Sequence, residues 1–205
     1  HLAYYDALTG LPNRTSMKML IEREIARSQK NTRNFGVLLY DLDEFKYIND
    51  SLGHDAGDVM IRSIASRLKS ITGEKAMVCR FGGDEFLTII PNIDSNESLM
   101  LIAKRSLDVF KEPVVLDHQS FFISASCGAA VYPQDGLDVE TLVRSADLAM
   151  YKSKGIGKNI VTFCTEELKS KVDDKTRLIN DLYKAIENNE LVLYDENLKD
   201  RTQIV

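Results

Sequence analysis

The sequence has few cysteines and no surplus of basic residues. The three cysteines, Cys79, Cys127 and Cys164, are odd in number, far apart and without Cys-x-x-Cys spacing. This pattern argues against a disulfide framework or a zinc site and fits a reducing cytoplasm. The 26 Lys and Arg residues are outnumbered by 31 Asp and Glu residues, and the net charge is −5. Because no basic surplus is available to line a nucleic-acid groove, we expect no nucleic-acid partner.

Long apolar runs are also missing. No run approaches the roughly 20 residues that a membrane-spanning helix needs, and no signal peptide is recognisable. We therefore expect a soluble, cytoplasmic fragment without direct membrane contact, which is compatible with a longer parent protein anchored elsewhere. What is present is an ordinary globular composition, with 44% hydrophobic and 28% charged residues. A length of 205 residues allows one good core, or one domain plus a fragment of another.

The stretch around which the chain is organised runs from Cys79 to Ile90, CRFGGDEFLTII. Two apolar runs flank the glycine pair, which predicts a hairpin turn because glycine reaches positive φ without steric cost. The adjacent carboxylates Asp84 and Glu85 then have two interpretations. One is a solvated loop tip. The other is a site where backbone N–H groups bared by the glycines approach phosphate and the carboxylates hold a divalent metal.

A second acidic cluster, Asp41 and Asp43, ends the apolar run of residues 35–39. Burying a strand that ends in Asp-x-Asp costs free energy unless the carboxylates face a cavity with cations or water. Magnesium needs only a few carboxylates, because phosphate oxygens and water complete its coordination. If the strands that carry Asp41 and Asp84 are neighbours, the two side chains can converge on one cation.

Residues 82–86 spell GGDEF, and here the chain resembles the bacterial diguanylate cyclases, which join two GTP into cyclic di-GMP. Four further segments resemble the same family in the same order: DALTGLPNR (6–14), DLDEFKYIND (41–50), LGHDAGD (52–58) and ADLAMYKSKGIGKN (146–159). The resemblance implies pyrophosphate release, two Mg²⁺ or Mn²⁺ ions per GTP site, and a homodimer in which each domain holds one GTP.

The resemblance also implies the site residues. Asp41, Asp84 and Glu85 are expected to be catalytic. The same three side chains are expected to bind metal together with the backbone carbonyl of Leu42. Eight residues are expected to bind substrate: Phe45, Lys46, Asn49, Asp58, Gly82, Gly83, Lys154 and Lys158.

Some of these residues also have simpler explanations. Asp58 matches a guanine-contacting position, where its carboxylate favours GTP over ATP, but it also precedes an apolar helical run and reads as an N-cap. Taken singly, Lys46, Lys154 and Lys158 each read as a surface lysine. Placement in the motif favours phosphate binding for the last two, although the family usually has Arg in place of Lys158. For Asp43 we expect a structural salt bridge.

One family feature is missing. Members that are inhibited by their product carry Arg-x-x-Asp nine and six residues before the first motif glycine, where this chain has Gly73 and Ala76. Neither residue offers a guanidinium or a carboxylate. We therefore expect weak or absent inhibition by cyclic di-GMP through this site.

Apolar periodicity predicts the order of the secondary structure. Strands are expected at 35–41, 77–80, 86–90, 114–116, 121–131 and 160–163, and helices at 16–28, 59–71, 97–110, 139–154 and from 166 onward. Between 35 and 131 the order is βαββαβ. This order predicts an α+β, ferredoxin-like palm, in which a central antiparallel sheet is flanked by helices and the helices of the repeat cover one face. Nucleotide cyclases and polymerase palms share this arrangement, but a fold alone does not define a function.

We expect a GGDEF domain over 1–165 and, over 166–205, a linker helix followed by the start of a truncated EAL-type phosphodiesterase domain. Residues 182–194, LYKAIENNELVLY, resemble the beginning of that domain, and 191–194 read as its first strand. The chain departs from the pattern at 195–197 and carries no Glu-Ala-Leu motif, so we expect no hydrolysis.

The tail leaves a second interpretation open. In tandem proteins a GGDEF module sometimes binds GTP without turnover and regulates its EAL neighbour. The intact carboxylates favour catalysis, but GTP binding needs nearly the same residues. The partners expected on either interpretation are GTP and neighbouring regulatory or EAL domains.

Overall fold

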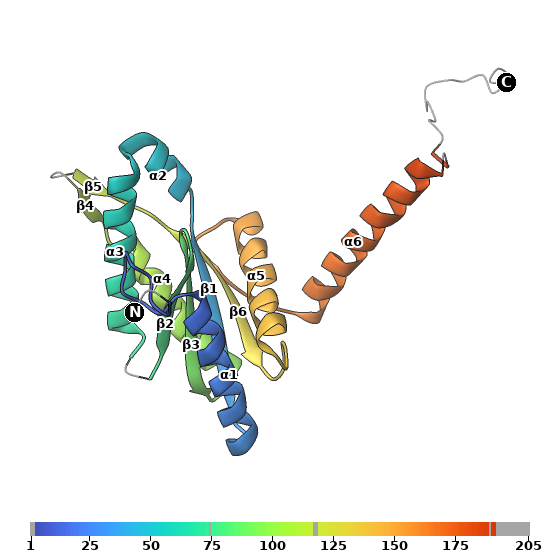
Figure 1. The fold of residues 1–205 in the computed structure, drawn as a ribbon, viewed down its shortest axis with the longest axis horizontal. Coiled ribbons are helices and arrows are strands. Elements are labelled where there is room, and N and C mark those ends of the chain that lie inside the picture. The colour runs from blue at the N-terminus through green and yellow to red at the C-terminus, as the bar shows by residue number, and fades with distance from the viewer. Residues whose placement is uncertain (1–2, 74, 117–118, 189, 192–205) are drawn as a thin grey trace. The chain divides into compact units, whose positions relative to one another are not determined.

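The computed structural model describes residues 3–73, 75–116, 119–188 and 190–191, with the backbone alone at 172–173 and 175–176 (Figure 1). The chain separates into two compact units, residues 1–168 and residues 169–205. The strand expected at 191–194 falls outside the described residues except for Leu191, which is not in a strand.

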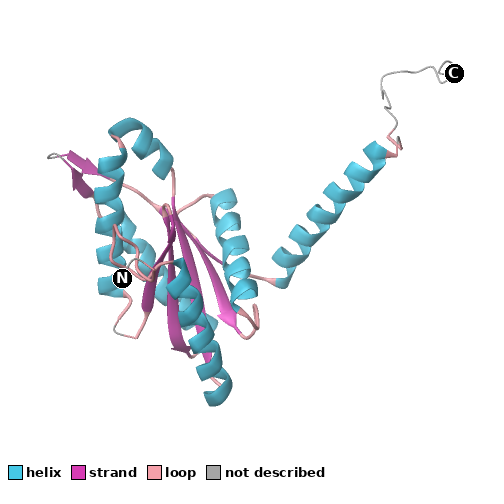
Figure 2. Ribbon diagram, viewed as in Figure 1, coloured by secondary structure: helices cyan, strands magenta, loops and turns pink. Residues whose placement is uncertain are grey.

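A five-stranded sheet forms the centre of the first unit (Figure 2). Its order is β2-β3-β1-β6-β7, and every neighbouring pair is antiparallel except β6 and β7. The elements are α1 (Arg14–Asn31), β1 (Asn34–Leu42), α2 (Phe45–Leu52), α3 (His54–Ile71), β2 (Met77–Gly82), β3 (Glu85–Ile93), α4 (Asn96–Lys111), β4 (Val114–Leu116), β5 (Gln119–Phe121), β6 (Ala125–Tyr132), α5 (Val139–Ile156), β7 (Val161–Phe163) and α6 (Glu166–Glu187). The predicted ferredoxin-like α+β class is confirmed, because β1, α3, β2, β3, α4 and β6 form its βαββαβ repeat.

Strand β1 lies in the middle of the sheet because its apolar run can be buried on both faces. Leu38 and Tyr40 point into a core formed with α3 and α4, whereas Val37 and Leu39 point into a second core formed with α1 and α5. The helices of the repeat cover one face, as predicted, and α1 and α5 from outside the repeat cover the other (Figure 2). Asp41, two residues beyond Leu39, therefore faces α5.

The predicted strand at 121–131 is confirmed over 125–131, but it starts too early, because residues 122–124 are in no strand. Residues 119–121 pair with β4 in a separate two-stranded sheet, and β6 begins only at Ala125, where it pairs with β1. The break is set by Ser124, whose backbone carbonyl accepts a hydrogen bond from Asp43 N at 2.8 Å. Phe122 just before it is 70% exposed, so this stretch of the chain leaves one sheet before it joins the other.

Side-chain caps define where two of the site's supporting helices begin. Asn13 accepts a hydrogen bond from Ser16 N at the start of α1, and Asp138 accepts one from Thr141 N at the start of α5. Both satisfy N–H groups that a helix leaves unpaired in its first turn. The caps fix the starting points of the two helices that cover the Asp41 face of the sheet.

Candidate functional site

The carboxylates of the two acidic motifs lie at the same end of the sheet. Asp41 on β1 is the register partner of Glu85 on β3. The two-residue turn Gly83-Asp84 joins β2 to β3, and Leu42 N donates a hydrogen bond to Asp84 O at 3.4 Å. Gly83 has a φ of +32°, in the left-handed region that the predicted glycine turn requires. The fold thus brings together two motifs that are more than forty residues apart in the chain.

The charges in this cluster are only partly compensated. Burial raises the pKa of Asp41, and the neighbouring carboxylates of Asp84 and Asp43 raise it further, against the effect of Lys154. Burial also raises the pKa of Glu85, and the negative charges of Asp41, Asp147 and Asp84 raise it further. A group whose pKa is raised in this way favours a nearby cation. The cluster is therefore suited to bind positive charge.

Asp147 on α5 was not singled out from the sequence, although its charge acts on Glu85. It lies seven residues, or about two helical turns, before Lys154, so both side chains lie on one side of α5. Helical spacing from the predicted Lys154 was the signal that would have found it.

Both lysines at the end of α5 are paired with carboxylates. Lys154 Nζ lies 2.6 Å from Asp41 Oδ1, and Lys158 Nζ lies 2.8 Å from Glu44 Oε1. The hydrogen bond from Lys158 lowers the pKa of Glu44. Glu44 is a second residue of the site that the sequence did not single out. Lys158 itself has a left-handed φ of 58°. To contact a phosphate, each lysine has to exchange its carboxylate partner for the ligand.

Asp43 has a structural role, but among the described residues it makes hydrogen bonds and not the salt bridge expected for it. The side chain is 8% exposed and accepts hydrogen bonds from Ser124 Oγ at 2.6 Å and Ser126 Oγ at 2.7 Å. It also accepts one from Asn159 N at 3.3 Å. Asp43 thereby ties the segment after α5 to the end of β1, close to Asp41.

The residues expected to contact the base form a separate group on α2 and α3. Asn49 and Phe45 lie directly over Gly57, where an added Cβ would clash with Asn49 Oδ1 and lie 3.1 Å from Phe45 Cζ. Lys46 is exposed on α2. Among the described residues, no hydrogen bond or ion pair links this group to the carboxylates around Asp84.

The interpretation of Asp58 as a helix N-cap is wrong. Helix α3 already begins at His54, with Gly53 at the cap, because its first turn continues through the HDAG segment. Asp58 lies in the second turn, with its Oδ2 at 4.0 Å from Arg62. Its carboxylate is therefore not used by backbone N–H groups of the helix start.

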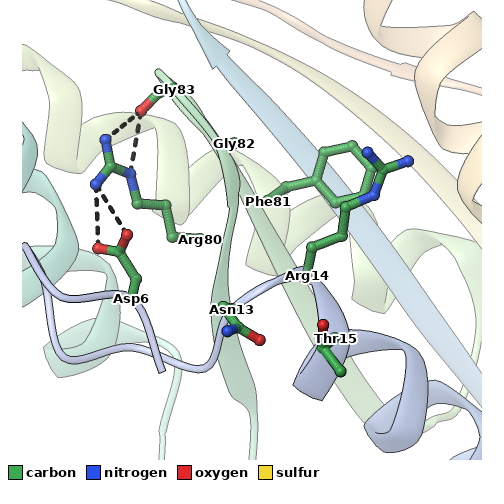
Figure 3. Close-up of a pocket in the computed structure, with 8 residues that line it drawn as sticks. All are labelled: Asp6, Asn13, Arg14, Thr15, Arg80, Phe81, Gly82 and Gly83. Carbon is green, nitrogen blue, oxygen red and sulfur yellow. Dashed lines mark hydrogen bonds and ion pairs between the residues drawn. The ribbon is translucent and has the colours of Figure 1, made fainter. Parts of the chain in front are cut away.

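A pocket of about 360 Å³ lies next to the glycine turn, between the N-terminal loop and β2, and both glycines of the turn line it (Figure 3). Arg80 joins its two walls. One guanidinium nitrogen donates to Asp6 Oδ1 and Oδ2 at 3.0 and 3.1 Å, and two others donate to Gly83 O at 3.1 and 2.7 Å. Burial opposes the charge on Asp6, but hydrogen bonds from Thr9 and Arg80 lower its pKa. The 6–14 segment, which the sequence singled out only as a motif of the family, is therefore bonded through Arg80 to the turn that carries Asp84.

Replacing Arg80 by Ala is expected to lower the free energy of unfolding by about 1–3 kcal/mol, because a half-buried carboxylate and the Gly83 carbonyl lose their donor. Urea denaturation at pH 7 measures this loss, with the exposed Arg105→Ala as the matched control. The lowered pKa of Asp6 means that the contribution is present above the carboxyl's ordinary range and is lost as the pH falls through its folded-state value. Equal stability of both variants would show that the bridge contributes nothing.

The described residues contain no group of three or more His, Cys, Asp or Glu side chains already arranged to hold a metal ion. The ammonium group of Lys154 supplies a positive charge next to Asp41. The available donors are carboxylate oxygens and a backbone carbonyl, the kind that Mg²⁺ and Mn²⁺ prefer. The donor set fits such an ion once Lys154 moves away. In the described part of the chain, no helix is long and apolar enough to span a membrane.

The chain is similar to known proteins of one family. The sequence profile of a family described as "Diguanylate cyclase, GGDEF domain" matches residues 3–160. The chain is 33% identical over 193 residues to the cyclic di-GMP phosphodiesterase NbdA of Pseudomonas aeruginosa, covering 94% of this chain and 24% of NbdA. It is 35% identical over 155 residues to the diguanylate cyclase TpbB of the same species, covering 75% of this chain and 36% of TpbB. The chain thus spans about a quarter to a third of these relatives.

Solved structures show the same fold. The isolated GGDEF domain of TpbB superposes with a TM-score of 0.79 at 30% identity, covering 82% of this chain and 99% of that domain. The GGDEF domain of DgcB from Caulobacter crescentus, solved in complex with c-di-GMP, gives a TM-score of 0.73 at 27% identity, covering 79% of this chain and 96% of that domain.

Proposed function

Because this chain belongs to the GGDEF domain family of diguanylate cyclases, we propose that it condenses two GTP molecules into cyclic di-GMP and releases pyrophosphate. The observation that carries the proposal is the meeting of Asp41, Asp84 and Glu85 at a glycine turn. Gathering carboxylates at a half-buried position costs free energy, and such clusters are typical of sites that bind a cation or perform chemistry. A solvated loop tip would not need the half-buried Asp41.

In this proposal two Mg²⁺ or Mn²⁺ ions per site are held by Asp41, Asp84, Glu85 and the carbonyl of Leu42. When bound, they lower the pKa of the attacking 3′-hydroxyl and neutralise the triphosphate. The raised pKa values of Asp41 and Glu85 support this assignment, because a cation relieves the repulsion among the carboxylates.

The chain's other residues position the nucleotide. Lys154 and Lys158 leave Asp41 and Glu44 and donate to the triphosphate, and Lys46 adds a third positive charge from α2. The backbone N–H groups of Gly82 and Gly83 approach the phosphates closely because neither residue has a side chain.

Guanine is assigned to the α2–α3 group. The carboxylate of Asp58 accepts hydrogen bonds from N1–H and the exocyclic amine, and Asn49 contacts the base edge. The ring of Phe45 lies beside Asn49 over Gly57, and both side chains use the space that the missing side chain of Gly57 leaves. Adenine has no matching pair of donors, so we propose GTP as the substrate. Because GTP is supplied in the cytoplasm, we propose the cytoplasm as the location.

The reaction joins two nucleotides, so we propose that each domain holds one GTP and that product forms across a homodimer.

The test is to incubate purified protein with GTP and Mg²⁺ over a hundredfold range of protein concentration and to quantify cyclic di-GMP by chromatography. The expected specific activity rises with concentration until the dimer dominates. A specific activity that stays constant well below the dimer's dissociation constant would overturn the half-site scheme.

The alternative function is a catalytically silent, GTP-binding regulatory module of a tandem GGDEF–EAL protein. One observation favours it, because the relative NbdA, which matches this chain over 193 residues, is named a phosphodiesterase and not a cyclase. The match to NbdA must also run past residue 160, whereas the match to TpbB spans 155 residues. This supports the proposal that 1–165 form the GGDEF domain and that 166–205 form a linker helix and the start of an EAL-type domain. Bound GTP that remains unconverted after overnight incubation at high protein concentration would favour the regulator.

A further inference from the structure

Glu44 and Lys158 form an ion pair between two segments that flank the proposed nucleotide site. Lys158 Nζ lies 2.8 Å from Glu44 Oε1. Glu44 immediately precedes α2, which carries residues assigned to the base, whereas Lys158 follows α5 and is assigned to the triphosphate. The pair therefore joins the base side of the proposed site to its phosphate side.

The backbone is strained at both ends of this pair. Glu44 has a φ of 60° and Lys158 has a φ of 58°, in the left-handed region that residues with a side chain rarely occupy. Asn159, next to Lys158, has a φ of 49°. Three of the five non-glycine residues with positive φ in the described part of the chain thus lie at one contact. Strain of this kind persists only where the surrounding structure imposes it, and it is concentrated at functional sites.

The carboxylate of Glu44 is not needed to hold this part of the fold together. The two segments are already joined by Asp43 Oδ2, which accepts a hydrogen bond from Asn159 N at 3.3 Å. At the start of α2, Glu44 accepts a hydrogen bond from Tyr47 N at 2.9 Å through its backbone carbonyl, and its side chain makes no capping hydrogen bond. What the carboxylate does hold is the ammonium group of Lys158.

The ion pair is also easy to open. The side chains of Glu44 and Lys158 are 70% and 44% exposed. Exposed pairs contribute little to stability, because water screens the charges and two long side chains lose conformational freedom. The lysine ammonium is a compact charge on a flexible stem, so it can turn from one anionic partner to another.

We propose that Glu44 sets the affinity of the domain for GTP by competing with the triphosphate for Lys158. Without nucleotide, Glu44 neutralises Lys158, and a bound triphosphate takes its place. Glu44 is then a residue that determines affinity without contacting the metal ions or the base. This inference rests on the proposed GTP site but not on turnover, since a cyclase and a silent GTP-binding module both have to bind the triphosphate.

Calorimetric titration of the 205-residue chain with 3′-deoxy-GTP and Mg²⁺ tests the proposal. This probe lacks the attacking 3′-hydroxyl, so binding is measured without turnover. Glu44→Gln is expected to lower the dissociation constant about threefold, which is the range of an exposed ion pair. Glu140→Gln is the matched control, because it removes another exposed Glu–Lys pair, with Lys18 at 3.6 Å, at the other end of α5. The control is expected to leave the dissociation constant unchanged.

A double-mutant cycle separates competition from simple repulsion between Glu44 and the triphosphate. At about 150 mM salt, charges more than about 8 Å apart are largely screened. In a Lys158→Met background, Glu44→Gln is expected to have no effect, because no ammonium group is left to compete for. A threefold effect that persists in this background would overturn the proposal.

Two other results of Glu44→Gln in the native background would also overturn it. An unchanged dissociation constant would show that the ion pair is only a surface contact. A higher one would show that Glu44 orients Lys158 for the nucleotide instead of withholding it. A chain that binds the probe but forms no cyclic di-GMP from GTP would contradict the proposed cyclase and leave this test intact, whereas no binding by the unsubstituted chain would contradict both.

Discussion

Asp84→Asn is expected to reduce cyclic di-GMP formation at least about a thousandfold, because it removes one of the three carboxylates that lie near the glycine turn and act on one another. Asn has nearly the same volume and keeps the turn, but it cannot supply the negative charge that a divalent cation and the attacking hydroxyl require. The measurement is the initial rate of product formation at saturating GTP and Mg²⁺. The protein concentration should be one at which the unsubstituted chain is dimeric.

The same substitution separates chemistry from folding. Asp84 repels Asp41 and Glu85, so removing its charge is expected to leave the thermal unfolding midpoint unchanged or to raise it. Asp94→Asn, at an exposed position after the far end of β3, is the matched control and should retain full activity. Substantial product from a folded Asp84→Asn protein would contradict the assignment of this cluster as the catalytic site.

Gly128→Ala is expected to destabilise the first unit by about 3 kcal/mol. Gly128 lies in β6, opposite Leu39 on β1 and Thr162 on β7. An added Cβ would overlap Ala146 O and Met150 N and would lie 2.9 Å from Met150 Cα. Because these are backbone atoms of α5, no rotamer change relieves the clash, and the helix must move off the sheet.

The control lies on the same helix. Gly155 of α5 has no atom within 4 Å of an added Cβ, so Gly155→Ala is expected to stabilise the protein by about 0.5–1 kcal/mol through helix propensity. Urea denaturation of the three proteins measures both effects. The close packing of α5 on β6 would not matter to stability if the two alanine variants unfolded at the same urea concentration.

Local signals in the sequence predicted the parts of the fold that depend on short segments. The glycine pair specified the β2–β3 turn, and the apolar run of β1 specified a central strand. Helix α2 was not predicted, because it is eight residues long and none of its residues is fully buried. Phe121 and Ala125 read as parts of one strand because the run of residues 121–131 is mostly apolar or small, although the two residues belong to different sheets.

The site was predicted as a set of residues but not as a set of contacts. Motif positions point to Asp41, Asp84 and Lys154, and the fold brings them to one end of the sheet. The bridge from Asp6 to Arg80 joins residues 74 positions apart, and no local pattern encodes it. The pairing of Lys158 with Glu44 spans 114 positions. Long-range ion pairs of this kind depend on the completed topology.

The pairing of Lys154 in α5 and of Lys158 just after it with acidic partners has a consequence for nucleotide binding. Under the proposed function, GTP does not enter an empty electropositive cavity. It would displace Lys154 and Lys158 from their carboxylate partners, and the carboxylate of Asp41 released in this way would become available to a metal ion. Metal and nucleotide would therefore bind as a mutually dependent pair, and either one alone would leave the other half of the exchange incomplete.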